Sequence, residues 1–143
     1  VEVGKFDHAY LPTKLDGIKG KATDVASSQY STAVLTDTGK VYLFNRVPKH
    51  EAQRQRKLYV DTDLDFTATQ AQFPQLCNTD ALAGHGRVRA LKDGFHAVNL
   101  VTDTGALFEL NTSFALRQLD SFTESSVVDV SIGWEHSLCL VAD

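Results

Sequence analysis

The sequence is poor in the residues that mark secreted, metal-binding and membrane-spanning proteins. Its 143 residues include no methionine, two cysteines, three prolines and one tryptophan. Cys77 and Cys139 form no CxxC pair, so we expect free thiols in a reducing compartment, with a single disulfide as the alternative. No apolar run approaches the roughly 18 residues of a membrane-spanning helix, and no amino-terminal signal pattern is present. These absences predict an intracellular protein without membrane insertion, and nothing in the sequence selects a compartment.

Positive charge and catalytic motifs are scarce as well. The chain has 14 Lys and Arg residues against 18 Asp and Glu, a net charge of −4, which argues against a dedicated nucleic-acid surface. The GxSxG elbow, the phosphate-binding P-loop pattern and the HExxH metal helix are all missing. The histidines are scattered, without i, i+4 spacing or a neighbouring cysteine pair: His8, His50, His85, His96 and His136. We therefore predict a protein that is not an enzyme, with no cofactor and no metal site.

What the sequence does contain is a repeat. The phrase Thr-Asp-Thr-Gly occurs at 36–39 and again at 102–105, each time between two apolar runs. In that register the apolar residues around the first copy fall on those around the second, and a third, shorter copy runs from Val127 to the end. An aspartate that bonds its own backbone and a glycine that tolerates positive φ favour a hairpin turn. Three imperfect strand–turn–strand copies predict units that stack, because none buries its face alone.

The spacing of the copies indicates the kind of repeat. The apolar anchors are Val25, Leu91 and Val130, and the first two lie much farther apart in the chain than the last two. Stacked helical solenoids keep a stricter period, whereas the loops between β-propeller blades absorb insertions. We therefore predict an all-β fold of about three four-stranded propeller blades, the outer ones incomplete. The predicted core consists of apolar residues from the strands of the three copies: Val25, Val34, Leu35, Val41, Leu43, Leu91, Leu100, Val101, Leu107, Val130, Leu138 and Leu140.

Two segments carry a family resemblance. The segment 25–42, Val-Ala-Ser-Ser-Gln-Tyr-Ser-Thr-Ala-Val-Leu-Thr-Asp-Thr-Gly-Lys-Val-Tyr, resembles a repeat of the regulator-of-chromosome-condensation (RCC1-like) β-propellers, and so does 130–140. The resemblance implies repeats at about 11–45, 73–111 and 114–143, with an insertion at about 46–72. It also implies structural repeat roles for four residues: Gly39, Gly105, Gly133 and His136. The repeats are degenerate, because the histidine slot holds Ser31 in the first copy and Ala97 in the second.

The ends of the chain predict an incomplete ring. The sequence opens inside the tail of one repeat and stops before the outer strand of the third copy, and it lacks an initiator methionine. A propeller needs roughly 4–8 blades to close, and open strand edges are prone to aggregate. We expect the chain to be a segment of a longer propeller, or a subunit that completes a ring with other segments.

Two places are candidates for binding a partner. Arg54, Arg56 and Lys57 belong to a basic stretch at 46–57, which would suit an acidic protein surface or, alternatively, would only keep a loop soluble. Trp134 and Glu135 precede the third-copy histidine, where an exposed tryptophan would anchor an interface. The alternative is that this tryptophan packs under the neighbouring blade.

These observations favour a non-catalytic protein–protein interaction scaffold, a segment of an RCC1-like propeller in a larger protein or assembly. The resemblance also implies two alternatives, guanine-nucleotide exchange on a small GTPase and a regulatory segment attached to a ubiquitin ligase. The expected partners are other proteins or the remainder of the propeller, with a small GTPase among them and no nucleic acid.

Overall fold

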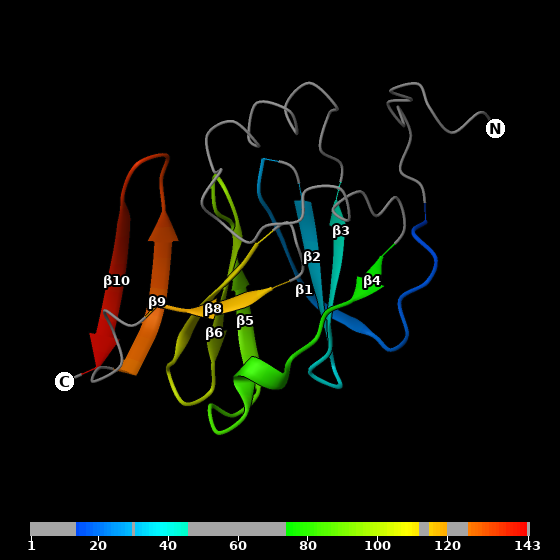
Figure 1. The fold of residues 1–143 in the computed structure, drawn as a ribbon, viewed down its shortest axis with the longest axis horizontal. Helices are drawn as coiled ribbons and strands as arrows, with labels where there is room; N and C mark the ends of the chain where they lie inside the picture. The colour runs from blue at the N-terminus through cyan, green and yellow to red at the C-terminus, as the bar shows by residue number, and fades with distance from the viewer. Residues whose placement is uncertain (1–13, 30, 46–73, 112–114, 120–125, 143) are drawn as a thin grey trace.

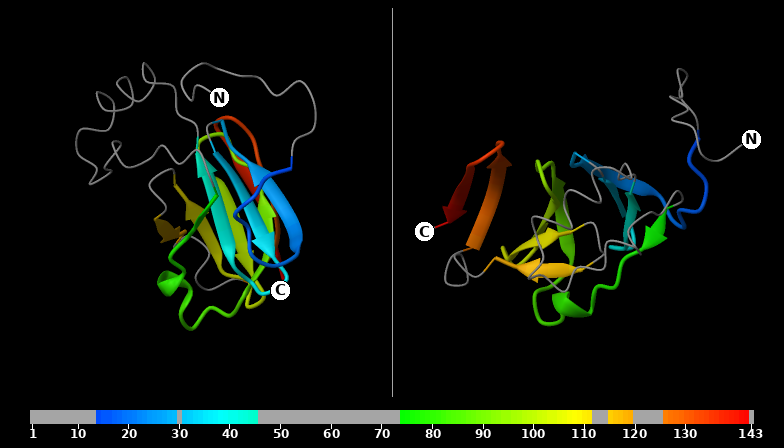
Figure 2. Two further views of the ribbon diagram at one scale, coloured as in Figure 1. Left: turned by 90° about the vertical axis from the view of Figure 1, so that its right-hand side faces the viewer. Right: turned by 45° about the horizontal axis from the view of Figure 1, so that its top comes forward.

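Strands dominate the computed structural model, which describes residues 14–29, 31–45, 74–111, 115–119 and 126–142. These residues form three antiparallel sheets and one short 3₁₀ helix, η1 (Asp80–Leu82), and no α-helix. The sheets follow one another in chain order across the molecule (Figure 1; Figure 2, right). This is the all-β arrangement of consecutive propeller blades that the repeat predicts.

Each sheet is a meander in which strands next to each other in the chain also pair in space. The first sheet contains β1 (Ala22–Ser27), β2 (Ser31–Thr36), β3 (Val41–Asn45) and β4 (Gln75–Leu76). The second contains β5 (Val88–Lys92), β6 (Val98–Thr102), β7 (Leu107–Leu110) and β8 (Leu116–Gln118). The third contains β9 (Ser126–Ile132) and β10 (Ser137–Ala142).

The sheets and the sequence repeats are offset from each other. The predicted second repeat begins at about residue 73, but β4 pairs with β3 and so completes the first sheet. Its partners are Tyr42 opposite Leu76 and Leu43 opposite Gln75, and the Cys77 N–H donates to the Val41 carbonyl at 2.9 Å. A repeat boundary in the sequence is therefore not a sheet boundary in the fold.

The first strand of every sheet carries the same irregularity. The register skips Thr23 in β1, Arg89 in β5 and Val128 in β9. These three positions keep the same intervals along the chain as the apolar anchors of the repeat, so the bulge is a repeated feature of the fold. A bulge bends its strand and increases the local twist. No residue motif in the sequence predicts these bulges.

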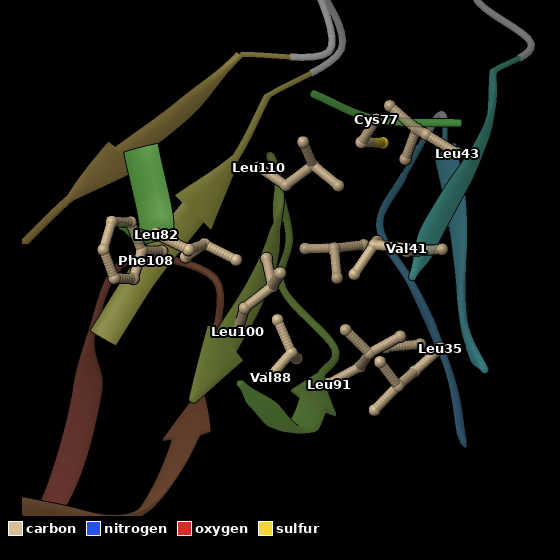
Figure 3. Packing of buried hydrophobic residues seen from close by; sticks show 13 residues of the cluster. Leu35, Val41, Leu43, Cys77, Leu82, Val88, Leu91, Leu100, Phe108 and Leu110 are labelled. Atoms are coloured by element: carbon tan, nitrogen blue, oxygen red, sulfur yellow. The ribbon is translucent and has the colours of Figure 1, made fainter. Parts of the chain in front are cut away.

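The core lies between the sheets, in two layers. Figure 3 shows Leu35 and Val41 of the first sheet pointing toward Leu91 and Leu100 of the second. The second layer joins the far side of the second sheet to the third sheet, through Val101, Leu107, Val127 and Val130. All of β6 is buried because both of its faces are covered, as in a central propeller blade.

Polar groups join the inner strands across the two junctions. At the first, the Asp24 carboxylate accepts from the Leu91 N–H at 2.9 Å, and the Asp93 carboxylate accepts from the Ser27 N–H at 2.7 Å. At the second, Lys92 Nζ lies 2.6 Å from Asp129 Oδ1. The hydrogen bond from Lys92 lowers the pKa of Asp129, and the Val130 N–H adds to this effect.

Three residues of the predicted core are exposed, and the prediction was wrong for them. Val25 is 62% exposed, Leu138 71% and Leu140 62%. Their strands have the predicted alternation, but these side chains lie on the outer faces of the first and third sheets, where no described residue covers them. Val34 is half-buried, and the remaining predicted core residues are buried as expected.

Candidate protein-interaction surface

The outer face of the first sheet has a repeat equivalent inside the protein. Its cross-strand row runs Val25, Val34, Tyr42 and Leu76, and we call it the leading face. In the second sheet the corresponding row begins with Leu91, Leu100 and Phe108, which all belong to the core cluster that the second sheet shares with the first. The leading face therefore has the register of a surface that buries itself against a preceding blade.

The described residues cover only part of the leading face. Tyr42 is buried, and its hydroxyl accepts a hydrogen bond from the Lys19 N–H at 3.3 Å. Lys19 thus contacts the tip of this side chain, while Val25 and Leu76 stay exposed. The apolar surface that is left lies toward β1 and β4.

The outer face of the third sheet is the complement of the leading face. We call it the trailing face, and it exposes Leu138 and Leu140 on β10. Their repeat equivalents in the first sheet are Ala33 and Leu35, which the second sheet buries. The chain thus presents both halves of its own sheet-to-sheet interface, one at each end of the stack.

A second surface is formed by the turns that lead from the first to the second strand of each sheet. In the first turn, the Ser28 N–H donates to the Ser31 carbonyl at 2.7 Å, and the two hydroxyls lie 2.6 Å apart. In the third turn, the Gly133 N–H donates to the His136 carbonyl at 2.8 Å. A Cβ on Gly133 would lie 2.7 Å from the His136 ring, so a glycine is needed where the histidine is present. A serine pair replaces both residues in the first copy.

An aromatic stack joins the second and third turns. The rings of Phe95 and Trp134 are stacked with centroids 4.4 Å apart at 16°, and His96 contacts Phe95 edge-on at 4.6 Å. Trp134 packs against the neighbouring blade and is nonetheless 69% exposed, so the two sequence interpretations of this residue both describe part of its environment. Sequence reasoning missed Phe95 and His96. The signal was there, since Phe95 follows the anchor Leu91 at the same interval at which Trp134 follows the anchor Val130.

At the opposite end of the blades, an open depression of about 460 Å³ lies between the first and second sheets. Its polar groups are engaged in the junction itself. The Arg87 guanidinium donates to the Asp37 carbonyl at 3.3 Å, and the Arg87 N–H donates to the Asp103 carboxylate at 3.0 Å. Arg89 donates to the Val128 carbonyl at 2.8 Å. The two arginines are balanced by two aspartates, and the arginine donors bond across the junctions between sheets. The polar groups of this depression therefore join the blades, and they leave few donors or acceptors for a ligand.

The turn glycines have a packing role at the same end. Gly39 and Gly105 have φ values of 78° and 83°, in the left-handed region that favours glycine. The Arg87 guanidinium lies over Gly39, and the backbone of Ser126 lies over Gly105. Each Thr-Asp-Thr-Gly turn therefore receives the beginning of the next sheet.

Among the described residues, no cluster of three or more His, Cys, Asp or Glu side chains could hold a metal ion. No helix in the described ranges is long and apolar enough to cross a membrane. Arg54, Arg56 and Lys57 lie outside the described residues, so the basic stretch stays a prediction. The partner-binding roles of Trp134 and Glu135 also stay predictions; both side chains are exposed.

The two cysteines are free and should differ in reactivity. Burial raises the pKa of the Cys77 thiol to about 12. Burial also raises the pKa of the Cys139 thiol, but Cys139 is less deeply buried than Cys77. Because the thiolate is the reactive form, we expect iodoacetamide at pH 8 to modify Cys139 at least tenfold faster than Cys77 in the folded chain. Mass spectrometry of the Cys139→Ser and Cys77→Ser variants would measure the two rates, and urea should equalise them. Equal rates without urea would contradict the burial of Cys77.

The arrangement of the sheets defines the fold: the described residues form blades with the fold of an RCC1-like β-propeller. The crystal structure of human WBSCR16 is similar at a TM-score of 0.62 and 16% identity, over 92% of this chain and 33% of that one. The crystal structure of Prp20p from Saccharomyces cerevisiae, a protein described with its binding to Gsp1p and histones, is similar at a TM-score of 0.55 and 12% identity. The match covers 90% of this chain and 32% of Prp20p. The crystal structure of yeast RCC1 (Prp20) bound to Kap60 is similar at a TM-score of 0.52 and 12% identity, over 93% of this chain and 32% of that one.

The chain spans about one third of each of these proteins. At such low identity the likeness shows the fold alone. No protein-family model matches the sequence, and no curated protein matches it.

Proposed function

We propose that the chain is a non-catalytic scaffold segment that joins further blades of the same type and binds other proteins through the assembled ring. The observation that carries the proposal is the pair of outer faces. The leading face and the trailing face are the repeat equivalents of the two surfaces that meet inside the chain, and each leaves apolar side chains exposed, Val25 and Leu76 on one and Leu138 and Leu140 on the other. Apolar burial stabilises by about 25 cal/mol per Å², so both faces favour association with another blade.

Native mass spectrometry of the gently purified protein tests this proposal. We expect a species heavier than the 15.7 kDa of the chain, containing either further propeller polypeptide or partner subunits. The Leu140→Glu substitution should abolish or strongly reduce that species, because it places a charge on the trailing face. Asp80→Asn, an exposed change on η1, is the control and should leave the species unchanged. A stable and soluble monomer with the mass of the chain alone would overturn the proposal.

A small GTPase is the second candidate partner, and the likeness to Prp20p supports it. An exchange factor would accelerate release of a fluorescent guanine nucleotide from the GTPase. The assay should use the assembled species, since the chain corresponds to only about one third of that protein. Acceleration would favour exchange, whereas stable binding without acceleration would favour the scaffold.

A further inference from the structure

We propose that the exposed ring of Trp134, supported by Phe95 and flanked by Glu135, receives an arginine side chain from a partner protein. This inference deepens the proposed function, on which it rests, because it names the chemistry of the partner. We call the surface made by Phe95, His96, Trp134 and Glu135 the turn surface.

The geometry leaves Trp134 available to a ligand. Phe95 covers one face of its ring in a nearly parallel stack at 4.4 Å and 16°. More than two thirds of the residue nevertheless stays in contact with water, at 69% exposure. His96 packs edge-on against Phe95, with ring centroids 4.6 Å apart. A large aromatic side chain that is both supported and exposed is a typical interface anchor, since tryptophan is enriched at binding hot spots.

The charges around the stack select a cation. Glu135 directly follows Trp134 and is exposed, and Asp93, whose carboxylate accepts from the Ser27 N–H, lies two residues before Phe95 in the sequence. The described residues of the three turns, at 28–29, 31, 93–97 and 133–136, include no lysine and no arginine. An aromatic face attracts a cation, and tryptophan does so best. Arginine suits this site better than lysine because its planar, weakly hydrated guanidinium can stack on the ring and bond a carboxylate at the same time.

The turn surface and the trailing face consist of different side chains. Trp134 lies on the β9–β10 turn, whereas the trailing face consists of side chains on β10 itself. Figure 1 shows that turn at the end of the third sheet opposite to η1. Substitutions on the turn surface therefore leave the side chains of the trailing face in place.

Trp134 is the only tryptophan in the chain, so its fluorescence reports directly on this site. The purified protein, in the assembly in which it is isolated, would be titrated with a short arginine–glycine peptide. The matched probe is the same peptide with neutral citrulline in place of arginine. We expect a saturable change in Trp134 emission with the arginine peptide, at an affinity about fivefold higher than with the citrulline peptide.

Two variants locate the binding on the turn surface. Glu135→Gln removes one exposed charge and should weaken arginine binding about threefold, while Phe95→Leu removes the supporting ring and should weaken it further. Asp80→Asn removes the same charge from η1 and should have no effect. Circular dichroism would show that each variant keeps its β-sheet signal, and the Glu135 variant carries the test if Phe95→Leu does not fold.

The outcomes separate this inference from the proposed function. Equal affinity for both peptides, no binding of either, or binding unchanged in Glu135→Gln would each overturn the arginine site. If the heavier species still forms in those cases, the scaffold proposal is unaffected. An arginine preference in a protein that stays at 15.7 kDa would support the site and overturn the ring.

Discussion

Replacing Gly105 by alanine is expected to lower the free energy of unfolding by about 3 kcal/mol. Two costs combine at this position. The residue has a φ of 83°, which strains any L side chain. The added Cβ would also lie 2.8 Å from Ser126 Cα and 2.9 Å from the Val127 nitrogen. Both atoms belong to backbone at the beginning of the third sheet, so they cannot move aside without shifting that sheet. Urea unfolding followed by circular dichroism would measure the loss.

Gly84 is the matched control for this substitution. Its φ of 82° is nearly the same, but nothing lies within 4 Å of its would-be Cβ. The Gly84→Ala substitution should lower the free energy of unfolding only through the strain of the positive φ, by about 1 kcal/mol. The difference between the two variants then isolates the close approach of the second and third sheets. Equal losses would show that the Thr-Asp-Thr-Gly turn does not receive the next sheet as described.

The Leu35→Ala variant is expected to lose about 3 kcal/mol of stability, whereas Leu140→Ala should lose less than about 0.5 kcal/mol in the isolated chain. The two leucines occupy the same position in their repeats. They differ in burial, with Leu35 4% exposed and Leu140 62% exposed. The second sheet covers Leu35, and no described residue covers Leu140. Chemical denaturation of the two variants beside the unsubstituted chain would measure both values.

The same pair reports on assembly. Once a further blade covers the trailing face, Leu140→Ala should lose as much free energy as Leu35→Ala. In that case the loss should be measured as weaker association between the blades. Association measured by analytical ultracentrifugation would reveal it. If Leu140→Ala weakened neither stability nor association, the trailing face would not be an interface.

The local features of the fold could be predicted from the sequence because they depend on local chemistry. The two Thr-Asp-Thr-Gly phrases identified hairpin turns, and the apolar alternation around them identified the strands. Leu100, Val101 and Leu107 are buried as predicted, because both faces of the central sheet are covered. Repetition at unequal spacing then indicated propeller blades.

The features that the sequence did not predict all depend on what lies opposite a residue. Alternation shows that Val25 and Leu138 point to one side of a strand, but it cannot show whether anything covers that side. The pairing of β4 with β3 across the predicted insertion depends on strand edges far apart in the sequence. The stack of Phe95 on Trp134 arises only when two turns meet in space.

The offset between sheets and repeats has a consequence for how the molecule can be divided. The strand that completes the first sheet follows the 46–73 segment in the chain, and two residue pairs together with the Cys77–Val41 hydrogen bond join it to β3. A backbone cut within that segment would leave two polypeptides that share one sheet, so the halves are natural candidates for split-protein complementation. The same short edge strand could be exchanged between two copies, which is how domain-swapped dimers arise. Because loop-closure entropy grows only slowly with length, evolution could lengthen this connection freely while keeping the number of blades constant.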